Sequence, residues 1–179
     1  TRIHRPHSTL NNVWISDPGS GKAKLLNRDA EHAFWAWAAI EVLRHTGIRS
    51  EELLEISHHA LVQYRLPDTG EVVPLLQIAP SKTDTERLLV VSPELAEVLS
   101  AVVSRVRGPN GTVPLVRAFD AHERIWLSPT SRLFQHRVNG EDQAIKASLI
   151  ATLLDEALTR TGLTDPEDGQ PLRFTPHDF

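Results

Sequence analysis

The chain has 179 residues and a mass of 20.0 kDa, which fits one domain of ordinary size with a short arm. It is 40% hydrophobic and 23% charged, has no cysteine, and contains no apolar stretch long enough for a membrane helix. These values exclude collagen-like, coiled-coil and wholly disordered chains, disulfide scaffolds and thiolate metal sites.

The formal net charge of −4 is unevenly distributed along the chain. Residues 1–28 hold five basic residues and one acidic residue, whereas residues 29–179 hold 14 basic and 22 acidic residues. Proline, glycine, serine and paired asparagine in residues 1–28 predict a basic linker or arm, with one extended piece at residues 13–15. Such an arm could contact phosphate groups, or it could be a solvated linker without a partner.

Two helices are predicted after this arm. Asn27 or Asp29 can cap the first helix and Gly47 suits its end, with apolar residues at helical spacing between them: Ala33, Phe34, Trp37, Ile40 and Leu43. The second helix is short and covers residues 50–56. Its apolar stripe is Leu53 and Ile56.

Three strands and a third helix come next. Alternating apolar residues predict strands at residues 61–66, 72–79 and 87–91, and the short connections between them favour an antiparallel meander. Ser92 and Pro93 then begin a helix that runs to Val106, because serine is a good N-cap and proline suits the first helical position.

The remainder holds one further helix before the last residues. Residues 108–144 are irregular, and a helix over residues 147–160 ends before Gly162. Thr175 and Pro176 then signal the start of another helix. The predicted fold class is therefore mainly α with a small three-stranded antiparallel β-sheet, an α+β fold.

Motifs for cofactor or metal chemistry are absent from the sequence. His122-Glu123 lacks a second histidine at ligand spacing, and the adjacent rings of His58 and His59 diverge on a helix or a strand. The chain has neither a P-loop nor the Gly-x-Ser-x-Gly elbow of a serine hydrolase. We therefore expect no metal and no cofactor.

Three basic side chains at element junctions are the candidate catalytic residues. Arg49 lies between two predicted helices, Lys82 in the loop between the second and third predicted strands, and His177 in the first turn of the helix that begins after Thr175. Together they suit a phosphate, because arginine binds two phosphoryl oxygens while lysine and histidine can transfer protons. Each also has an ordinary interpretation as a solvated surface residue, and Arg49 could simply pair with Glu52.

The order of these residues resembles that of the tyrosine recombinases, the phage-integrase family. Thr46-Gly47-Ile48-Arg49-Ser50-Glu51-Glu52-Leu53 resembles the first-arginine box of that family. Pro80-Ser81-Lys82-Thr83, with the run from Glu86 to Pro93, resembles its hairpin lysine, and Thr175-Pro176-His177-Asp178-Phe179 resembles the opening of its His-x-x-Arg box. The resemblance covers residues 29–179.

The resemblance implies a role for each of these residues. Arg49 would bind the DNA phosphate, Glu52 would support the active site, Lys82 would protonate the departing 5′ oxygen, and His177 would assist proton transfer at the nucleophile. In that family a tyrosine forms a 3′-phosphotyrosyl link without metal or cofactor. That tyrosine would lie beyond Phe179, so residues 29–179 would be an inactive catalytic-domain fragment. Tyr64 does not match the nucleophile and is interpreted as a sheet residue.

The resemblance further implies a cytoplasmic enzyme of DNA recombination or integration, which acts as a tetramer on double-stranded DNA and needs no membrane. Two other functions stay open. One is a non-catalytic DNA- or protein-binding module on the same scaffold. The other is a helical interaction domain, in which Trp35, Trp37 and Trp126 form a core or an interface.

Overall fold

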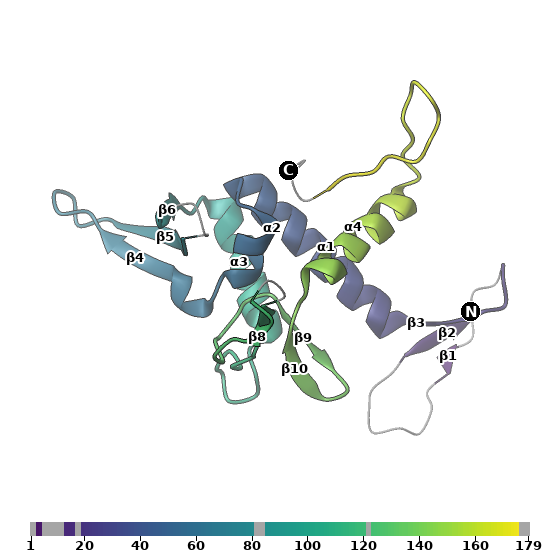
Figure 1. Cartoon of the computed structure of the whole chain (residues 1–179), viewed down its shortest axis with the longest axis horizontal. Coiled ribbons are helices and arrows are strands. Elements are labelled where there is room, and N and C mark those ends of the chain that lie inside the picture. The colour runs from purple at the N-terminus through teal and green to yellow at the C-terminus, as the bar shows by residue number, and fades with distance from the viewer. Residues whose placement is uncertain (1–2, 5–12, 17–18, 81–84, 121–122, 176–179) are drawn as a thin grey trace.

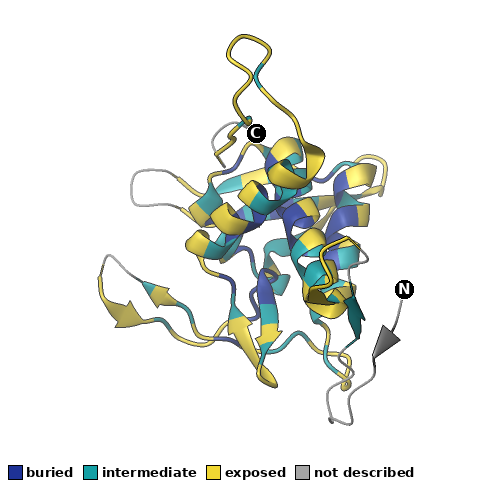
Figure 2. Ribbon diagram, turned by 90° about the vertical axis from the view of Figure 1, so that its right-hand side faces the viewer, coloured by how far each residue is buried: buried dark blue, intermediate teal, exposed yellow. Residues whose placement is uncertain are grey.

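Helix α1 (Leu26–Thr46) lies at the centre of the computed structural model, which describes residues 3–4, 13–16, 19–80, 85–120 and 123–175 (Figure 1). The helices α2 (Ser50–Glu55), α3 (Pro93–Val106) and α4 (Ala147–Thr161) all contact α1. Figure 2 shows the buried residues gathered where these helices meet, and Ala38, Ala39, Val42 and Leu43 of α1 are fully buried there. The two alanines allow a close approach of the neighbouring helices because their side chains are small.

The predicted start of α1 is wrong, whereas its predicted end is confirmed. The helix begins at Leu26, and neither Asn27 nor Asp29 caps it. Instead, Oδ1 of Asn27 accepts a hydrogen bond from the backbone N–H of Val13 at 2.6 Å, which ties the preceding segment to the helix. Gly47 ends the helix with φ at 63°, the left-handed conformation that glycine adopts without a steric penalty.

The predicted apolar stripe of α1 is wrong at Trp37, whose exposed fraction is 42%. Trp35 is the buried tryptophan, and its ring centroid lies 5.7 Å from that of Phe134. Because α3 and α4 both pack on α1, the buried face is wider than the stripe and centred differently. Helical spacing indicates that a buried face exists, but its width depends on the neighbouring helices.

The predicted meander is confirmed as a three-stranded antiparallel sheet of β4 (Leu61–Arg65), β5 (Val72–Ile78) and β6 (Arg87–Val90), in the order β4-β5-β6. A one-turn 3₁₀ helix, η1 (His58–Ala60), connects α2 to β4. Leu76 and Ile78 of β5 are buried, so their face of the sheet packs against the helices. The β4–β5 hairpin extends away from the helices in Figure 1.

The two later helices are confirmed. Oγ of Ser92 accepts a hydrogen bond from the backbone N–H of Leu95 at 3.2 Å at the start of α3, and Pro93 is the first helical residue. Helix α4 ends at Thr161, one residue later than predicted, and Gly162 follows with φ at 68°. None of the described helices combines the length and the apolar composition that crossing a membrane requires.

Residues 108–144 are more regular than predicted. They contain two antiparallel hairpins, β7 (Phe119–Asp120) with β8 (Ile125–Trp126), and β9 (Gln135–Val138) with β10 (Glu141–Ala144). The turn of the second hairpin is Asn139-Gly140, with φ at 51° and 89°. Asn-Gly is a strong hairpin signal, because both turn positions require positive φ. Strands this short leave little alternation in the sequence.

The described parts of residues 1–28 also differ from a plain linker. Strands β1 (Ile3–His4), β2 (Trp14–Ser16) and β3 (Ala23–Leu25) form a small antiparallel sheet in the order β1-β2-β3. The extended piece predicted at residues 13–15 corresponds to β2. The fold is thus a mixed α and β structure of four described helices and small antiparallel sheets, as an α+β class requires.

Candidate functional site

Arg49 occupies the N-cap position of α2 and is exposed to solvent. Its carbonyl accepts the N–H of Leu53 at 2.9 Å, and its own N–H donates to Oε2 of Glu52 at 2.8 Å. Gly47 reverses the chain at the end of α1, and the buried Ile48 anchors the connection. The local sequence therefore fixes the backbone of Arg49 while its side chain stays at the surface.

Glu52 is the buried anchor of this turn, with an exposed fraction of 3%. Beside the N–H of Arg49, its carboxylate accepts hydrogen bonds from Nη2 of Arg87, at 2.7 Å from each oxygen. A buried carboxylate is stable only when it is paired and hydrogen-bonded, and this one has both kinds of partner. Glu52 thus joins the start of α2 to a residue 35 positions further along the chain.

Arg87 lies at the base of the connection between β5 and β6. It is the first residue of β6 and pairs in register with Ile78, the last residue of β5. Lys82 belongs to this connection but lies outside the described residues, as does His177. The ion pair between Glu52 and Arg87 therefore holds the base of the Lys82 loop against the helix that begins after Arg49.

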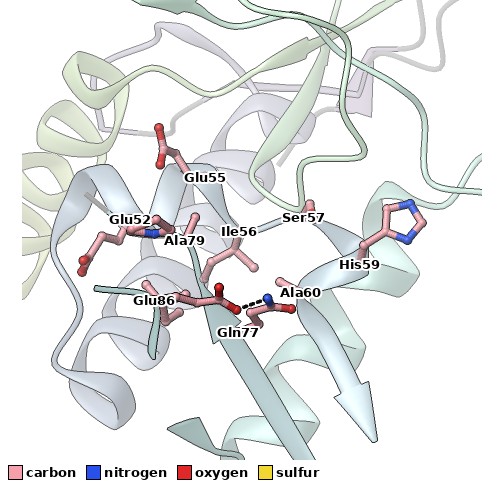
Figure 3. A pocket seen from close by; sticks show the side chains of 11 residues that line it. Glu52, Glu55, Ile56, Ser57, His59, Ala60, Gln77, Ala79 and Glu86 are labelled. Atoms are coloured by element: carbon pink, nitrogen blue, oxygen red, sulfur yellow. Dashed lines mark hydrogen bonds between the residues drawn. The ribbon is translucent and has the colours of Figure 1, made fainter. Parts of the chain in front are cut away.

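A hollow of about 250 Å³ lies beside this ion pair and is shown in Figure 3. Its lining comes from α2, η1 and β5 and from residues on both sides of the Lys82 loop. Three of the lining residues are glutamates: Glu52, Glu55 and Glu86. Glu86 accepts a hydrogen bond from the side chain of Gln77. In the described part of the chain, no group of three or more histidine, cysteine or acidic side chains could hold a metal ion.

The other end of α2 is held by Arg132, which the sequence reasoning did not single out. Its exposed fraction is 9%, and its Nη1 donates to the carbonyl of Leu54 at 2.6 Å. Burial lowers the pKa of the Arg132 guanidinium, and the nearby Glu55 opposes that shift. Backbone hydrogen bonds from His58 to Ser131 and from Leu133 to Ile56, each 2.8 Å long, complete the junction. Helix α2 is thus bound at both ends by arginines from distant segments.

A sequence pattern could have identified Arg87 as a partner of a buried acid, but no pattern could have identified Arg132. Arg87 precedes Leu89 by two residues in β6, so strand alternation places both on the face toward the helices. That placement could have identified Arg87 as a partner of a buried acid. Arg132 stands before the buried Leu133 and Phe134 without any pattern that names its partner.

The remaining aromatic predictions have separate outcomes. Tyr64 is confirmed as a sheet residue in β4, with an exposed fraction of 49%. Trp126 is 57% exposed on β8, where its ring contacts Phe119 and the guanidinium of Arg117. Of the three tryptophans assigned to a core or an interface, only Trp35 is in the core.

In the comparisons with known proteins, no family model, curated protein or solved structure matches this chain. The functional interpretation therefore rests on the residues and contacts described above.

Proposed function

We propose that this chain is the catalytic-domain portion of a tyrosine-type site-specific DNA recombinase. The supporting observation is the buried carboxylate of Glu52, which binds both the backbone of Arg49 and the guanidinium of Arg87. This arrangement brings the start of α2 and the base of the Lys82 loop to one place. It is the arrangement that a shared phosphate site would need.

In this proposal the phosphate of a DNA strand lies against the exposed guanidinium of Arg49, whose planar fork matches two phosphoryl oxygens. A tyrosine oxygen of the intact parent attacks the phosphorus, and the bond from phosphorus to the 5′ oxygen breaks. Lys82 donates the proton that this leaving oxygen needs, and His177 assists proton transfer at the tyrosine. The 3′-phosphotyrosyl link conserves the bond energy, so rejoining needs no cofactor. The intact parent acts on double-stranded DNA in the cytoplasm as a tetramer.

The acidic hollow in Figure 3 favours a second candidate, a non-catalytic protein-binding module. Glu55 and Glu86 line the hollow and are both exposed, which suits a lysine or arginine side chain of a protein partner better than a phosphate. This function would use the same scaffold without any DNA contact at Arg49.

Binding of short DNA duplexes, measured by fluorescence anisotropy, separates the two candidates. We expect binding that weakens between about 50 and 200 mM salt and a loss of about tenfold in Arg49→Ala. The control is Arg124→Ala, which removes an exposed arginine of the β7–β8 turn. If duplexes do not bind, or if both variants weaken binding equally, the recombinase proposal fails.

Chemistry is tested on the gene product extended by the natural residues that follow Phe179. The proposal expects an arginine directly after Phe179 and a tyrosine further along that forms a covalent adduct with nicked duplex DNA. Substitution of Lys82 by alanine should abolish the adduct, and a 5′-bridging sulfur in the DNA should restore it because a thiolate leaves without a proton. DNA binding without any adduct would support the non-catalytic module instead.

A further inference from the structure

A second hollow lies away from Arg49, at the other end of α3. It has a volume of about 570 Å³ and lies between the first turns of α1, the C-terminal end of α3, the turn at residues 108–114 and the β9–β10 hairpin. Helix α3 is 14 residues long, so the hollow at its C-terminal end is about 20 Å from its N-terminal end, which follows β6. The volume is in the range of about 300–1,000 Å³ that small-molecule sites occupy.

A buried amide in the wall of this hollow has one unused acceptor. Gln135 has an exposed fraction of 2%, and its Nε2 donates to the carbonyls of Pro114 and Arg132, at 3.1 and 2.6 Å. Its Oε1 is buried and has no donor among the residues that the structure describes. The orientation of the amide is determined, because a flip would place Oε1 against two carbonyl oxygens. Because solvent does not reach Oε1, this amide supports the wall of the hollow by joining β9 to Pro114.

Two arginines that line the hollow have guanidinium groups without an acidic partner among the described residues. Among the described residues the Arg107 side chain makes no hydrogen bond or ion pair, and Arg137 uses only its Nε, which donates to the carbonyl of Gly140 at 3.0 Å. The third arginine of the hollow, Arg105, is already paired with Glu31 at 2.5 Å and lies over the ring of Phe34. The hollow therefore offers two guanidinium groups to an incoming anion.

The acidic groups of the hollow do not cancel this charge. Glu31 is fully engaged, because one oxygen accepts from Arg105 and the other from the indole N–H of Trp35 at 3.1 Å. The other acidic residue that lines the hollow is Asp142. It lies opposite Arg137 in the register of the hairpin, but no ion pair joins the two side chains. Burial lowers the pKa of His136, so its ring is neutral at pH 7 and can both donate and accept a hydrogen bond.

We propose that this hollow binds a small organic oxyanion, a phosphate or carboxylate on a body that also carries a hydrogen-bond donor. The oxyanion pairs with the guanidinium groups of Arg107 and Arg137, and the donor meets the ring of His136, which also lines the hollow. A nucleoside monophosphate has this chemistry, with a phosphate and an amine on a body of suitable size. The proposal does not depend on the function proposed above.

Calorimetric titration of the full chain at about 150 mM salt tests the proposal. The probes are adenosine 5′-monophosphate, citrate and, as a neutral comparison, adenosine. We expect one or both anions to bind and adenosine not to bind. Monophosphate binding identifies a phosphate ligand, and citrate binding alone identifies a carboxylate ligand. A parallel titration with the same probes is followed by ¹⁵N NMR. The indole N–H signal of Trp35, assigned by comparison with Trp35→Phe, should shift when the anion binds.

Two double variants, one inside the hollow and one outside it, each remove two positive charges. Arg107→Gln/Arg137→Gln should weaken binding of the anion by at least about tenfold. Arg124→Gln/Arg173→Gln also removes two exposed arginines, neither of which lines the hollow, and should leave the affinity unchanged. The proposal is overturned if neither anion binds or if the two double variants lose affinity equally.

Discussion

Replacement of Arg87 by methionine would leave the buried carboxylate of Glu52 without its guanidinium partner. Arg87→Met keeps most of the aliphatic length of the side chain, so the change isolates the charge and the hydrogen bonds. The N–H of Arg49 would remain as a described partner of the carboxylate, at 2.8 Å.

The expected loss of stability follows from burial on the two sides of the pair. Breaking a fully buried ion pair from one side costs about 3–5 kcal/mol, because a charge remains without compensation. Here the Glu52 side chain is 2% exposed but the Arg87 side chain is 39% exposed, so water screens part of the interaction. With the remaining hydrogen bond included, we expect the free energy of unfolding to fall by about 2 kcal/mol.

Urea unfolding followed by circular dichroism measures this loss. With a slope of about 2.5 kcal/mol per molar urea for a chain of this length, the midpoint should fall by about 0.8 M. Arg65→Met is the matched control: it makes the same substitution in the same sheet, where the exposed Arg65 side chain donates a hydrogen bond to the carbonyl of Gly70. That variant should lose less than about 0.5 kcal/mol.

A double-mutant cycle with Glu52→Gln gives the decisive comparison. If the pair acts as described, the losses of Arg87→Met and Glu52→Gln should be non-additive by at least about 1 kcal/mol. Additive losses, or an Arg87→Met midpoint equal to that of Arg65→Met, would refute the reasoning that this pair holds the Lys82 loop to α2.

Three further predictions concern local stability. Ser92→Ala removes the cap of the Leu95 N–H and should cost about 1 kcal/mol in urea unfolding, whereas Ser92→Thr should cost less. Gly47→Ala should cost about 1–2 kcal/mol because φ is 63° there, although no atom would contact the new Cβ; an equal loss in Gly47→Asn would contradict this cause. The folded-state pKa of His136 is lowered by burial, so the unfolded chain takes up a proton first as the pH falls below about 6.5, and the native state loses stability there. Urea midpoints over this pH range should fall less in His136→Asn than in the wild type, and parallel curves would exclude His136 as the cause.

Structural features that depend on residues close together in the chain were easier to predict from the sequence than features that depend on distant residues. The boundaries at Gly47, Ser92 and Gly162 were predictable because a helix cap uses hydrogen bonds within one turn. The hairpins in residues 108–144 were not predicted because their strands have only two to four residues and show little alternation, although Asn139-Gly140 signals the turn of the second hairpin.

The residues of the candidate site also fall into those that the sequence identified and those that it did not. Arg49 and Glu52 were named together because both lie in the run that resembles the first-arginine box, and the structure joins them by the hydrogen bond from the N–H of Arg49 to Glu52. Arg87 and Arg132 were missed as site residues because their partners, Glu52 and the carbonyl of Leu54, are 35 and 78 positions away. The roles of Lys82 and His177 stay predictions, since both lie outside the described residues.

The sequence by itself determined helices α1 to α4 apart from the start of α1, the meander and the turn that exposes Arg49, because propensities, caps and alternation act over a few neighbouring residues. Only the tertiary structure decided which charged side chains are buried and paired. Desolvation of Glu52 depends on every segment that covers it, and the guanidinium that compensates its charge comes from another strand. The hollow at Gln135 was likewise decided by packing, because it forms where α1, α3 and the β9–β10 hairpin meet.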